Sequence, residues 1–427
     1  MSRQTDWTPD GSTAVLLLGN YRPAVSLARS LKPLGYRVVV GLGGGEGGAQ
    51  YSRFADESWD HPPLEDGREP FLAALCAFLH ARADIRVVFP VAEPFVRLVA
   101  AERARLPADR IYAVPSPAIV ERALDKVAAY AVARSVGVPV APYALAHGPA
   151  ELARRCEEVG YPVFLRPLDS TNRLGGRKGL IVASRDELAR IVPRWPGPDT
   201  ALLVQHRVNG TRHNLFFAAR DGKLVRVLET RIARTDAPDQ TGLAVDGETV
   251  APSDDLVRFT ERLAVALGYS GVGLAQYLVD REAGAVFFIE LNPRVAGSHA
   301  ITEAAGLQLG YLSIVLAAPG APEIPFVAGV PGLRYAWTYG DLRGLVAALH
   351  AGLPRRDALR WAWGMVRACL RADVHMTWWW SDPLPTLALF ARALPLADRV
   401  LGRPPSRSTA LHPAPSAAPS ASASASR

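Results

Sequence analysis

The chain of 427 residues has no long apolar run and few cysteines. No stretch of about eighteen uncharged apolar residues occurs, and the segment Met1 to Gly11 is polar, so the sequence predicts neither a transmembrane helix nor a signal peptide. The three cysteines, Cys76, Cys156 and Cys369, lie far apart, which argues against a metal knuckle or a redox pair. These absences indicate a cytoplasmic protein without stable membrane insertion.

The sequence also lacks arginine runs and alternating aromatic and basic residues, although its formal net charge is +7. Dispersed basic residues do not form the continuous surface that nucleic acid needs, so no nucleic-acid partner is predicted. Anionic small molecules explain the positive charge equally well. The length and the ordinary apolar fraction of 49% indicate an enzyme-sized body of roughly two or three packed units.

The first part of the chain, residues 1–118, is expected to form a small α/β domain with a parallel sheet, because short apolar runs alternate there with segments of helical spacing. The expected strands are 14–19, 36–42, 85–91 and 111–114, and the expected helices are 23–34 and 93–104. Ligands of such sheets bind at the carboxyl ends of strands, which places Gly19 and Glu93 near a site. The glycine stretch 41–48 does not lead into an apolar helix, so we interpret it as a flexible loop rather than a phosphate cradle.

Residues 119–325 are expected to form the central domain, with two lobes and a hinge near residues 203–210. Helical spacing covers residues 117–136 at its start. In the first lobe we expect the strands 162–166 and 180–183 and the helix 184–192. In the second lobe, which is α+β, we expect the strands 201–206, 212–220, 223–231, 272–280 and 285–291, a hairpin turn at Asp221-Gly222, and a helix at 254–267.

The last part of the chain is expected to be a helical region, residues 326–402, followed by a tail. The helical region is rich in arginine and tryptophan, including Trp361, Trp363 and the run 378–380. Burial of the tryptophans beneath a helical cap is the favoured interpretation, and a helix lying on a membrane surface is the alternative. Residues 403–427 consist largely of Pro, Ser and Ala and are predicted to be disordered.

The clearest chemical pattern lies at the end of the apolar strand 285–291. Glu290, Asn292 and Arg294 occupy alternate positions and therefore point the same way. The carboxylate and amide oxygens are hard ligands suited to magnesium, and the arginine can hold a developing phosphoryl charge. Gln276 can bring a third oxygen from a neighbouring antiparallel strand. A surface ion pair between Glu290 and Arg294 is the alternative.

The segment Glu290 to Arg294, which reads ELNPR, resembles the Glu-x-Asn-x-Arg signature of ATP-grasp enzymes. The order of elements around it is similar to that of the carbamoyl-phosphate synthetase and biotin carboxylase branch. The resemblance implies an α/β and α+β architecture: an ATP-grasp fold preceded by a small parallel-sheet domain and followed by a helical region. It also implies that Gln276, Glu290 and Asn292 bind Mg²⁺, or Mn²⁺ in its place, and that Arg294 acts at the reacting phosphate.

Upstream segments extend this resemblance to the phosphates of ATP. Lys126 lies in an Asp-Lys pair similar to the family's pair, whose lysine reaches the nucleotide phosphates. Arg166 stands where the family has a second phosphate-binding cation. Gly175, Gly176 and Gly179 resemble the glycine-rich phosphate lid. A solvated basic turn is the alternative for this loop, because it also holds arginine and lysine.

The segment 203–214 resembles the hinge that binds adenine in the family, which implies nucleotide contacts from Gln205, His206 and Val208. This hinge departs from the family pattern, because Gln-His stands where Gln-Glu is common. Backbone groups can still bond the adenine edge without the glutamate. Arg212 and His213 are similar to an Arg-His pair of the carboxylase branch.

Two short motifs near the chain ends are similar to elements of amine-ligating members, namely residues 52–56 and 380–385. Glu93 is a candidate for contacting the substrate, because it follows a strand end that faces the presumed cleft. His213 and His299 could act as acid-base groups, but a structural role is the favoured interpretation for both.

The resemblance as a whole implies an ATP-dependent carboxylate-amine ligase that forms an amide through an acyl phosphate and releases ADP and phosphate. Its expected partners are a small carboxylic acid, an amine and, as in many members, a second copy of the chain. Two alternatives remain open. One is an enzyme that makes carboxyphosphate from bicarbonate and carboxylates or carbamoylates an acceptor, and the other is a nucleotide-binding regulator without catalysis.

Overall fold

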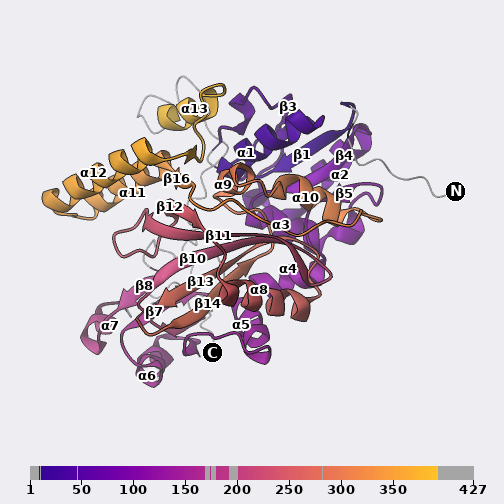
Figure 1. Ribbon diagram of the computed structural model, residues 1–427. Coiled ribbons are helices and arrows are strands. Elements are labelled where there is room, and N and C mark those ends of the chain that lie inside the picture. Colours follow the sequence, from indigo (N-terminus) through magenta and orange to yellow (C-terminus); the bar gives the residue numbers. More distant parts are fainter. Residues whose placement is uncertain are drawn as a thin grey trace, which may run out of the picture.

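The structure of the chain is a computed structural model (Figure 1). It describes residues 9, 11–45, 47–168, 174, 179–191, 201–280 and 282–392. Within these residues the chain forms three sheets and the helices that cover them. None of the helices in this part of the chain combines the length and the apolar character needed to cross a membrane.

The first sheet is entirely parallel and has the strand order β3-β2-β1-β4-β5. Its strands are β1 (Ala14–Leu18), β2 (Arg37–Gly41), β3 (Glu57–Trp59), β4 (Ile85–Pro90) and β5 (Ile111–Tyr112), and its helices are α1 (Arg22–Leu31), α2 (Arg68–Ala81) and α3 (Glu93–Ala101). Every residue of β1 is buried, as expected for a strand covered on both faces. Val15 and Leu17 pack toward α1, whereas Leu16 and Leu18 pack toward α2 and α3.

The glycine stretch 41–48 is a loop, as predicted, but its glycines serve close packing. A Cβ atom on Gly44 would lie 2.3 Å from the Phe95 ring, and one on Gly45 would lie 2.2 Å from the carbonyl oxygen of Asn20. Gly43 donates its N–H to Nε2 of His61. In the described residues of this stretch, 41–45 and 47–48, close backbone packing therefore leaves no room for side chains at Gly44 and Gly45. The flexibility of the loop stays a prediction.

Two helices lead into the central region where the sequence predicted one. They are α4 (Pro117–Leu124) and α5 (Lys126–Ser135). The break lies at Asp125, which has an extended backbone and accepts a hydrogen bond of 2.8 Å from the Ala128 N–H. Asp125 is thus the N-cap of α5, and its capping geometry is incompatible with one continuous helix. The break also places Lys126 at the first position of α5.

The second sheet is small and antiparallel, with the order β6-β9-β7-β8. It consists of β6 (Tyr143–Ala146), β7 (Val163–Pro167), β8 (Leu180–Val182) and β9 (Leu202–His206), with helices α6 (Pro149–Val159) and α7 (Arg185–Ile191). Leu152 and Cys156 of α6 pack against Val163, Leu165 and Val204 of the sheet. This packing fixes β7 and β9 side by side, and both strands supply residues to the cleft described below.

The third sheet has eight strands in the order β14-β13-β10-β11-β12-β16-β17, and β15 pairs separately with β11. Its bounds are β10 (Thr211–Arg220), β11 (Lys223–Thr235), β12 (Ala244–Val250), β13 (Gly271–Asp280), β14 (Ala285–Asn292), β15 (Val327–Ala328), β16 (Arg334–Ala336) and β17 (Val374–His375). The predicted turn at Asp221-Gly222 joins β10 to β11, with φ values of 49° and 83°. Helix α8 (Asp254–Leu267) packs on one face with α5, and α10 (Leu309–Ala317) packs on the other.

Helix α9 (His299–Ala304) ends the central region together with α10, and the C-terminal region contains α11 (Thr338–His350), α12 (Arg355–Arg371) and α13 (Leu384–Arg392). It is not only helical, because β15, β16 and β17 lie in it or at its edge and extend the large sheet. Helices α11 and α12 project from the body beside β12 and β16 (Figure 1). The two short motifs near the chain ends, residues 52–56 and 380–385, contact each other. Asp382 accepts hydrogen bonds from Ser52 Oγ and the Arg53 N–H.

Candidate functional site

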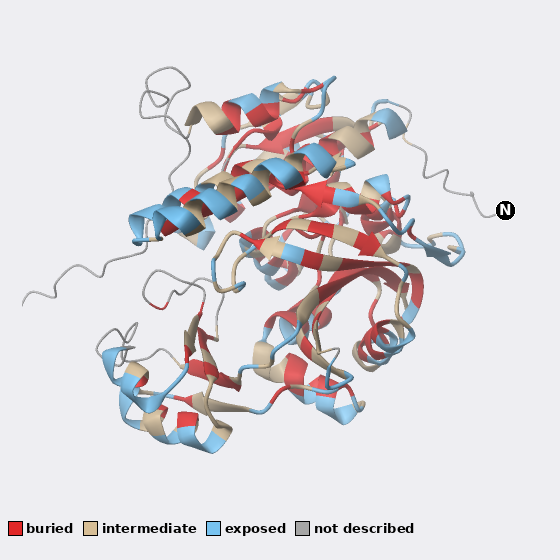
Figure 2. Ribbon diagram, turned by 60° about the vertical axis from the view of Figure 1, so that its left-hand side comes forward, coloured by how far each residue is buried: buried red, intermediate tan, exposed pale blue. Residues whose placement is uncertain are grey.

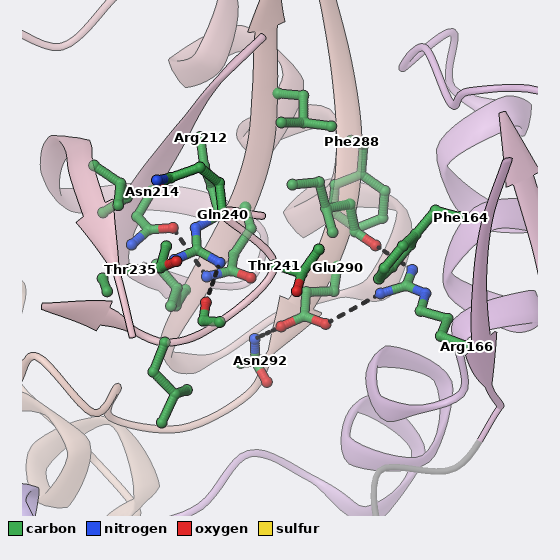
Figure 3. Close-up of a pocket in the computed structure, with 18 of the residues that line it drawn as sticks. Phe164, Arg166, Arg212, Asn214, Thr235, Gln240, Thr241, Phe288, Glu290 and Asn292 are labelled. Carbon is green, nitrogen blue, oxygen red and sulfur yellow. Dashed lines mark hydrogen bonds and ion pairs between the residues drawn. The ribbon is translucent and has the colours of Figure 1, made fainter. Parts of the chain in front are cut away.

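A cleft of about 650 Å³ lies between the small antiparallel sheet and the large sheet. Residues from β7, β9, β10, β13 and β14 line it, and residues of the first domain, Arg22 and Glu93, close one end. Figure 3 shows Glu290 and Asn292 on one wall of the cleft, with Arg166 reaching toward them from β7. The carboxyl end of the first sheet and the two lobes of the central region therefore meet at one cavity.

The three predicted metal ligands lie together in this cleft. Gln276 on β13 stands directly opposite Glu290 on β14 in the antiparallel register, as the sequence suggested. The Nδ2 amide of Asn292 donates a hydrogen bond of 2.9 Å to Oε1 of Glu290, and Nε2 of Gln276 donates one of 2.9 Å to Oδ1 of Asn214. Each amide uses its nitrogen in these bonds, which leaves both carbonyl oxygens for a cation.

These residues fit a magnesium ion that a phosphate also ligates. No group of three or more His, Cys, Asp or Glu side chains in the described part of the chain could hold a metal by itself. One carboxylate and two amide oxygens form an incomplete set of hard ligands. Magnesium is commonly bound in this way, by one or two protein carboxylates together with phosphate oxygens and water.

Arg166 lies on β7 and is 7% exposed. Its guanidinium donates to the Tyr130 hydroxyl at 2.5 Å and to the Ile289 carbonyl at 3.4 Å, and it lies 3.8 Å from the Glu290 carboxylate. Tyr130 in turn donates to the Ile289 carbonyl at 3.0 Å. The bonds through Tyr130 hold the guanidinium in one orientation beside the metal ligands, which is the geometry that a phosphate-binding cation requires.

Lys126 also lines the cleft, at the start of α5. Its ammonium donates a hydrogen bond of 2.6 Å to the Leu168 carbonyl at the end of β7. Tyr130 lies one helical turn after Lys126 and therefore on the same face of α5. The helix that presents the lysine thus also supports Arg166.

The hinge residues Gln205, His206 and Val208 line the cleft as well. Gln205 is 9% exposed and donates from Nε2 to the Tyr130 hydroxyl at 3.3 Å. The His206 N–H bonds the Pro142 carbonyl, and its Nδ1 lies 3.1 Å from the Gly160 carbonyl. The backbone N–H of Val208 has no partner among the described residues, which leaves it available to the edge of a planar base.

The expected phosphate lid is only partly described. Gly175 and Gly176 lie outside the described residues. Gly179 does not line the cleft; a Cβ atom there would lie 2.3 Å from the Phe164 ring and 2.9 Å from the Leu165 carbonyl. Close packing against β7 is therefore the observed reason for glycine at position 179, and Phe164 is the residue that faces the cleft.

Arg294 lies at the end of the cleft nearest the first domain. Its guanidinium donates to the Tyr21 hydroxyl at 3.3 Å and to the Val295 carbonyl at 3.0 Å. Glu93, the predicted substrate contact, begins α3 on the same end of the cleft and forms an ion pair of 3.0 Å with Arg97. This end therefore holds both a cation and a carboxylate.

Several residues that line the cleft were not predicted as site residues from the sequence. Arg212 and Asn214 on β10 face the cavity, and the loop from β11 to β12 adds Gln240 and Thr241 (Figure 3). Arg212 donates to the Gly242 carbonyl at 2.9 Å, and burial lowers its pKa from the usual value. Asn214 could have been predicted if β10 had been paired with β13, because this pairing places Asn214 opposite Gln276.

The two histidines considered as acid-base groups lie elsewhere. His213 faces away from the cleft, where its Nδ1 lies 2.6 Å from the buried carboxylate of Glu229. His299 is 1% exposed, contacts Thr302 through Nδ1 at 3.0 Å, and has its pKa lowered by burial. Neither histidine is among the residues that line the cleft.

The chain is similar to known proteins in both sequence and fold. Residues 244–321 match the family model described as carbamoyl-phosphate synthase L chain, ATP binding domain. The carbamoyl phosphate synthase large chain of Pyrococcus furiosus is 29% identical over 210 residues, which is 46% of this chain and 19% of that relative. The chain thus spans less than a fifth of the length of the first curated relatives it matches.

Solved structures show the same fold. A biotin carboxylase complexed with β,γ-ATP from Campylobacter jejuni superposes with a TM-score of 0.58 at 20% identity, covering 73% of this chain and 72% of that chain. The ADP complex of the N5-carboxyaminoimidazole ribonucleotide synthetase purK superposes with a TM-score of 0.60 at 13% identity, covering 84% of this chain and 98% of that chain. The predicted fold, an ATP-grasp fold after a parallel-sheet domain, is confirmed.

Proposed function

We propose that this chain, which has an ATP-grasp fold and is similar in sequence to carbamoyl phosphate synthase large chains, is an ATP- and Mg²⁺-dependent carboxylate-amine ligase. It would join a small carboxylic acid to an amine through an acyl phosphate and release ADP and phosphate. The observation that carries the proposal is the convergence of Arg166, Gln276, Glu290, Asn292 and Arg294 on one cleft.

The residues divide into two groups along the cleft. Lys126 and Arg166 would hold the triphosphate, and Gln276, Glu290 and Asn292 would bind the magnesium ion, which neutralises phosphate charge when it is bound. Catalysis by such a site consists mostly of alignment and charge stabilisation. The fixed orientation of Arg166 by Tyr130 supports this, because a guanidinium already in place needs no reorganisation during the reaction.

Arg294 would act where the carboxylate oxygen attacks the terminal phosphorus. In that step an O–P bond forms to the substrate carboxylate while the bond from the same phosphorus to ADP breaks. An amine nitrogen then attacks the acyl carbon, the carbon–oxygen bond to phosphate breaks, and the nitrogen loses a proton to give the amide. Arg294 and the carboxylate Glu93 both line this end of the cleft, which supports binding of an anionic acid and a cationic amine there.

An assay of ADP release tests the proposal. The purified chain with ATP and magnesium is supplied with pools of small carboxylic acids, amines and amino acids. We expect release to need an acid and an amine together, and to disappear in Glu290→Gln. Glu261→Gln, on the exposed face of α8, is the matched control and should keep full activity.

Two other outcomes would replace this proposal. Release that needs bicarbonate and an acceptor would assign the chain to carboxyphosphate chemistry. ATP binding without release in any pool, bicarbonate included, would favour a nucleotide-binding regulator, for which the altered Gln205-His206 hinge is the supporting observation.

A further inference from the structure

Helix α12 carries a continuous apolar stripe on its outer side. Leu359, Trp363, Val366 and Leu370 recur at intervals of three or four residues, which places them on one helix face. Their exposed fractions are 72%, 70%, 43% and 81%. Single exposed apolar residues are ordinary, but a contiguous stripe of this length is typical of a docking surface.

The opposite side of α12 contacts the body of the protein. Trp361 donates its indole N–H to the Asp341 carboxylate at 2.6 Å, and the same carboxylate pairs with Arg234 at 2.5 Å. Ala368 is buried against the body. These contacts hold the helix against the body and do not involve the outer stripe. In Figure 2 most of this long helix is coloured as exposed or intermediate.

The same helix is strongly basic. Its arginines are Arg355, Arg356, Arg360, Arg367 and Arg371, and all five are exposed. Against five arginines the helix has one acidic residue, Asp357, which gives it a net charge of 5 − 1 = +4. Asp357 pairs with Arg360, and within the described residues no carboxylate forms an ion pair with the other four.

The charge decides which partner fits the stripe. A second copy of the chain would bring a second helix of the same positive charge, so pairing of α12 with itself is disfavoured by repulsion. An anionic lipid surface supplies the opposite charge along with an apolar layer. Tryptophan and leucine on one face with arginine beside them are the features of a helix that lies in a membrane interface.

We propose that α12 is a membrane-docking helix, which lies on an anionic phospholipid surface with Leu359, Trp363, Val366 and Leu370 inserted among the lipid chains. Attachment would be peripheral and reversible, and arginines beside the stripe would contact lipid phosphates. For this region the sequence left open a helix that lies on a membrane surface. The arrangement of α12 supports that alternative.

Vesicle flotation of the full-length chain tests the proposal. The vesicles contain either phosphatidylcholine alone or equal parts of phosphatidylcholine and phosphatidylglycerol. We expect flotation with the anionic vesicles and much less with the neutral ones. Trp363→Gln with Leu370→Gln, and separately Arg367→Glu with Arg371→Glu, should each lower the partition coefficient by about tenfold or more.

The matched control is Val265→Gln with Arg262→Glu, a pair on the exposed face of α8, with Val265 62% exposed. This variant should partition like the wild type. Equal loss in the control, or loss only in the arginine variant, would overturn docking through the stripe. Absence of vesicle binding would also overturn it; self-association that Trp363→Gln abolishes would then identify a second copy as the occupant, and capture by an acidic protein would identify a protein partner.

Discussion

Two clusters of charged and polar residues in this molecule, one around Asp382 and one around Glu290, differ in how their hydrogen bonds are completed. At Asp382, which is 2% exposed, the carboxylate accepts from Arg29 Nε at 2.9 Å, Ser52 Oγ at 2.7 Å and the Arg53 N–H at 2.9 Å. Every contact comes from the chain itself, and Asp382 does not line the cleft. This cluster fastens the C-terminal region onto the first domain.

The cluster around Glu290 is completed only in part by the chain. Arg166 lies 3.8 Å from Glu290, and the buried Nε atoms of Arg166, Arg212 and Arg294 have no hydrogen-bond partner within the described part of the chain. All three arginines line the cleft, so a bound ligand can reach these donors. The same residue types therefore serve two purposes. Around Asp382 the chain supplies the hydrogen-bond partners and the cluster stabilises the contact between two regions, whereas around Glu290 some donors are left for a ligand.

The largest effect is expected for a substitution in the cleft, which should lower the activity and leave the stability nearly unchanged. Replacing Arg294 with Gln should lower the rate of ADP release by roughly 10² to 10³, because a donor aimed at developing charge is lost. The free energy of unfolding should change little, since Arg294 is only half-buried and forms no ion pair among the described residues. Steady-state kinetics and urea unfolding measure the two quantities.

Arg294→Lys is the control for this prediction. It keeps the charge but loses the planar fork, so it should restore only part of the rate. The contrary result would be an Arg294→Gln variant that unfolds in less urea than the wild type but keeps its rate of ADP release when folded. Arg294 would then stabilise the fold and not the reaction.

The opposite pattern is expected at Asp382. Replacing it with Asn should lower the free energy of unfolding by about 3 kcal/mol, because the buried Arg29 guanidinium loses its charged partner. The rate of ADP release by the folded fraction should stay close to that of the wild type. Urea unfolding followed by tryptophan fluorescence gives the first quantity. A loss of rate without loss of stability would show that the fastening also shapes the cleft.

The sequence predicted which strands carry the site residues better than it predicted where one helix ends and the next begins. The ELNPR motif correctly predicted that Glu290 and Asn292 point the same way, because alternation along a strand needs no tertiary information, and their role as metal ligands stays a prediction. The facing position of Gln276 followed from assuming an antiparallel neighbour. The break at Asp125 was missed, because helical spacing continues across it and only the capping bond reveals it.

Other features depended on contacts between distant segments. Residues 52–56 and 380–385 were weak motifs by themselves, and their meeting at Asp382 could not be read from either one. The cleft loop with Gln240 and Thr241 has no local pattern and is recognised only from its position over β10. The packing of Gly44 against Phe95 likewise joins two segments whose approach no spacing in the sequence indicates.

A smaller change in stability is expected at a third cluster, in which Asp341 contacts both Arg234 and Trp361. Asp341 is 1% exposed, and the Trp361 indole donates to it at 2.6 Å. Trp361→Phe removes this hydrogen bond to a charged group while keeping an aromatic ring, so the free energy of unfolding should fall by about 2 kcal/mol. Trp363→Phe on the exposed side of the same helix is the matched control and should leave stability unchanged, as urea unfolding would reveal.

The smallest effect concerns pH and the packed glycine loop. Burial lowers the pKa of His61, and the neutral ring accepts from the Gly43 N–H through Nε2. The unfolded chain therefore takes up a proton at a higher pH than the folded chain, so stability is full above a pH of about 6.5 and falls as the pH decreases. The contribution of this one group to the slope cannot exceed about 1.4 kcal/mol per pH unit.

Unfolding of His61→Gln at several pH values isolates this contribution. Glutamine can still accept from Gly43 but does not titrate, so the stability of the variant should fall less steeply below a pH of about 6.5 than that of the wild type. His299 and His375, whose pKa values are also lowered by burial, remain in both proteins and cancel in the comparison. His80→Gln, at an exposed position on α2, should keep the wild-type slope. Equal slopes for His61→Gln and the wild type would mean that the glycine loop opens enough to hydrate the imidazolium, and that the loop, unlike the cluster at Asp382, is not fastened.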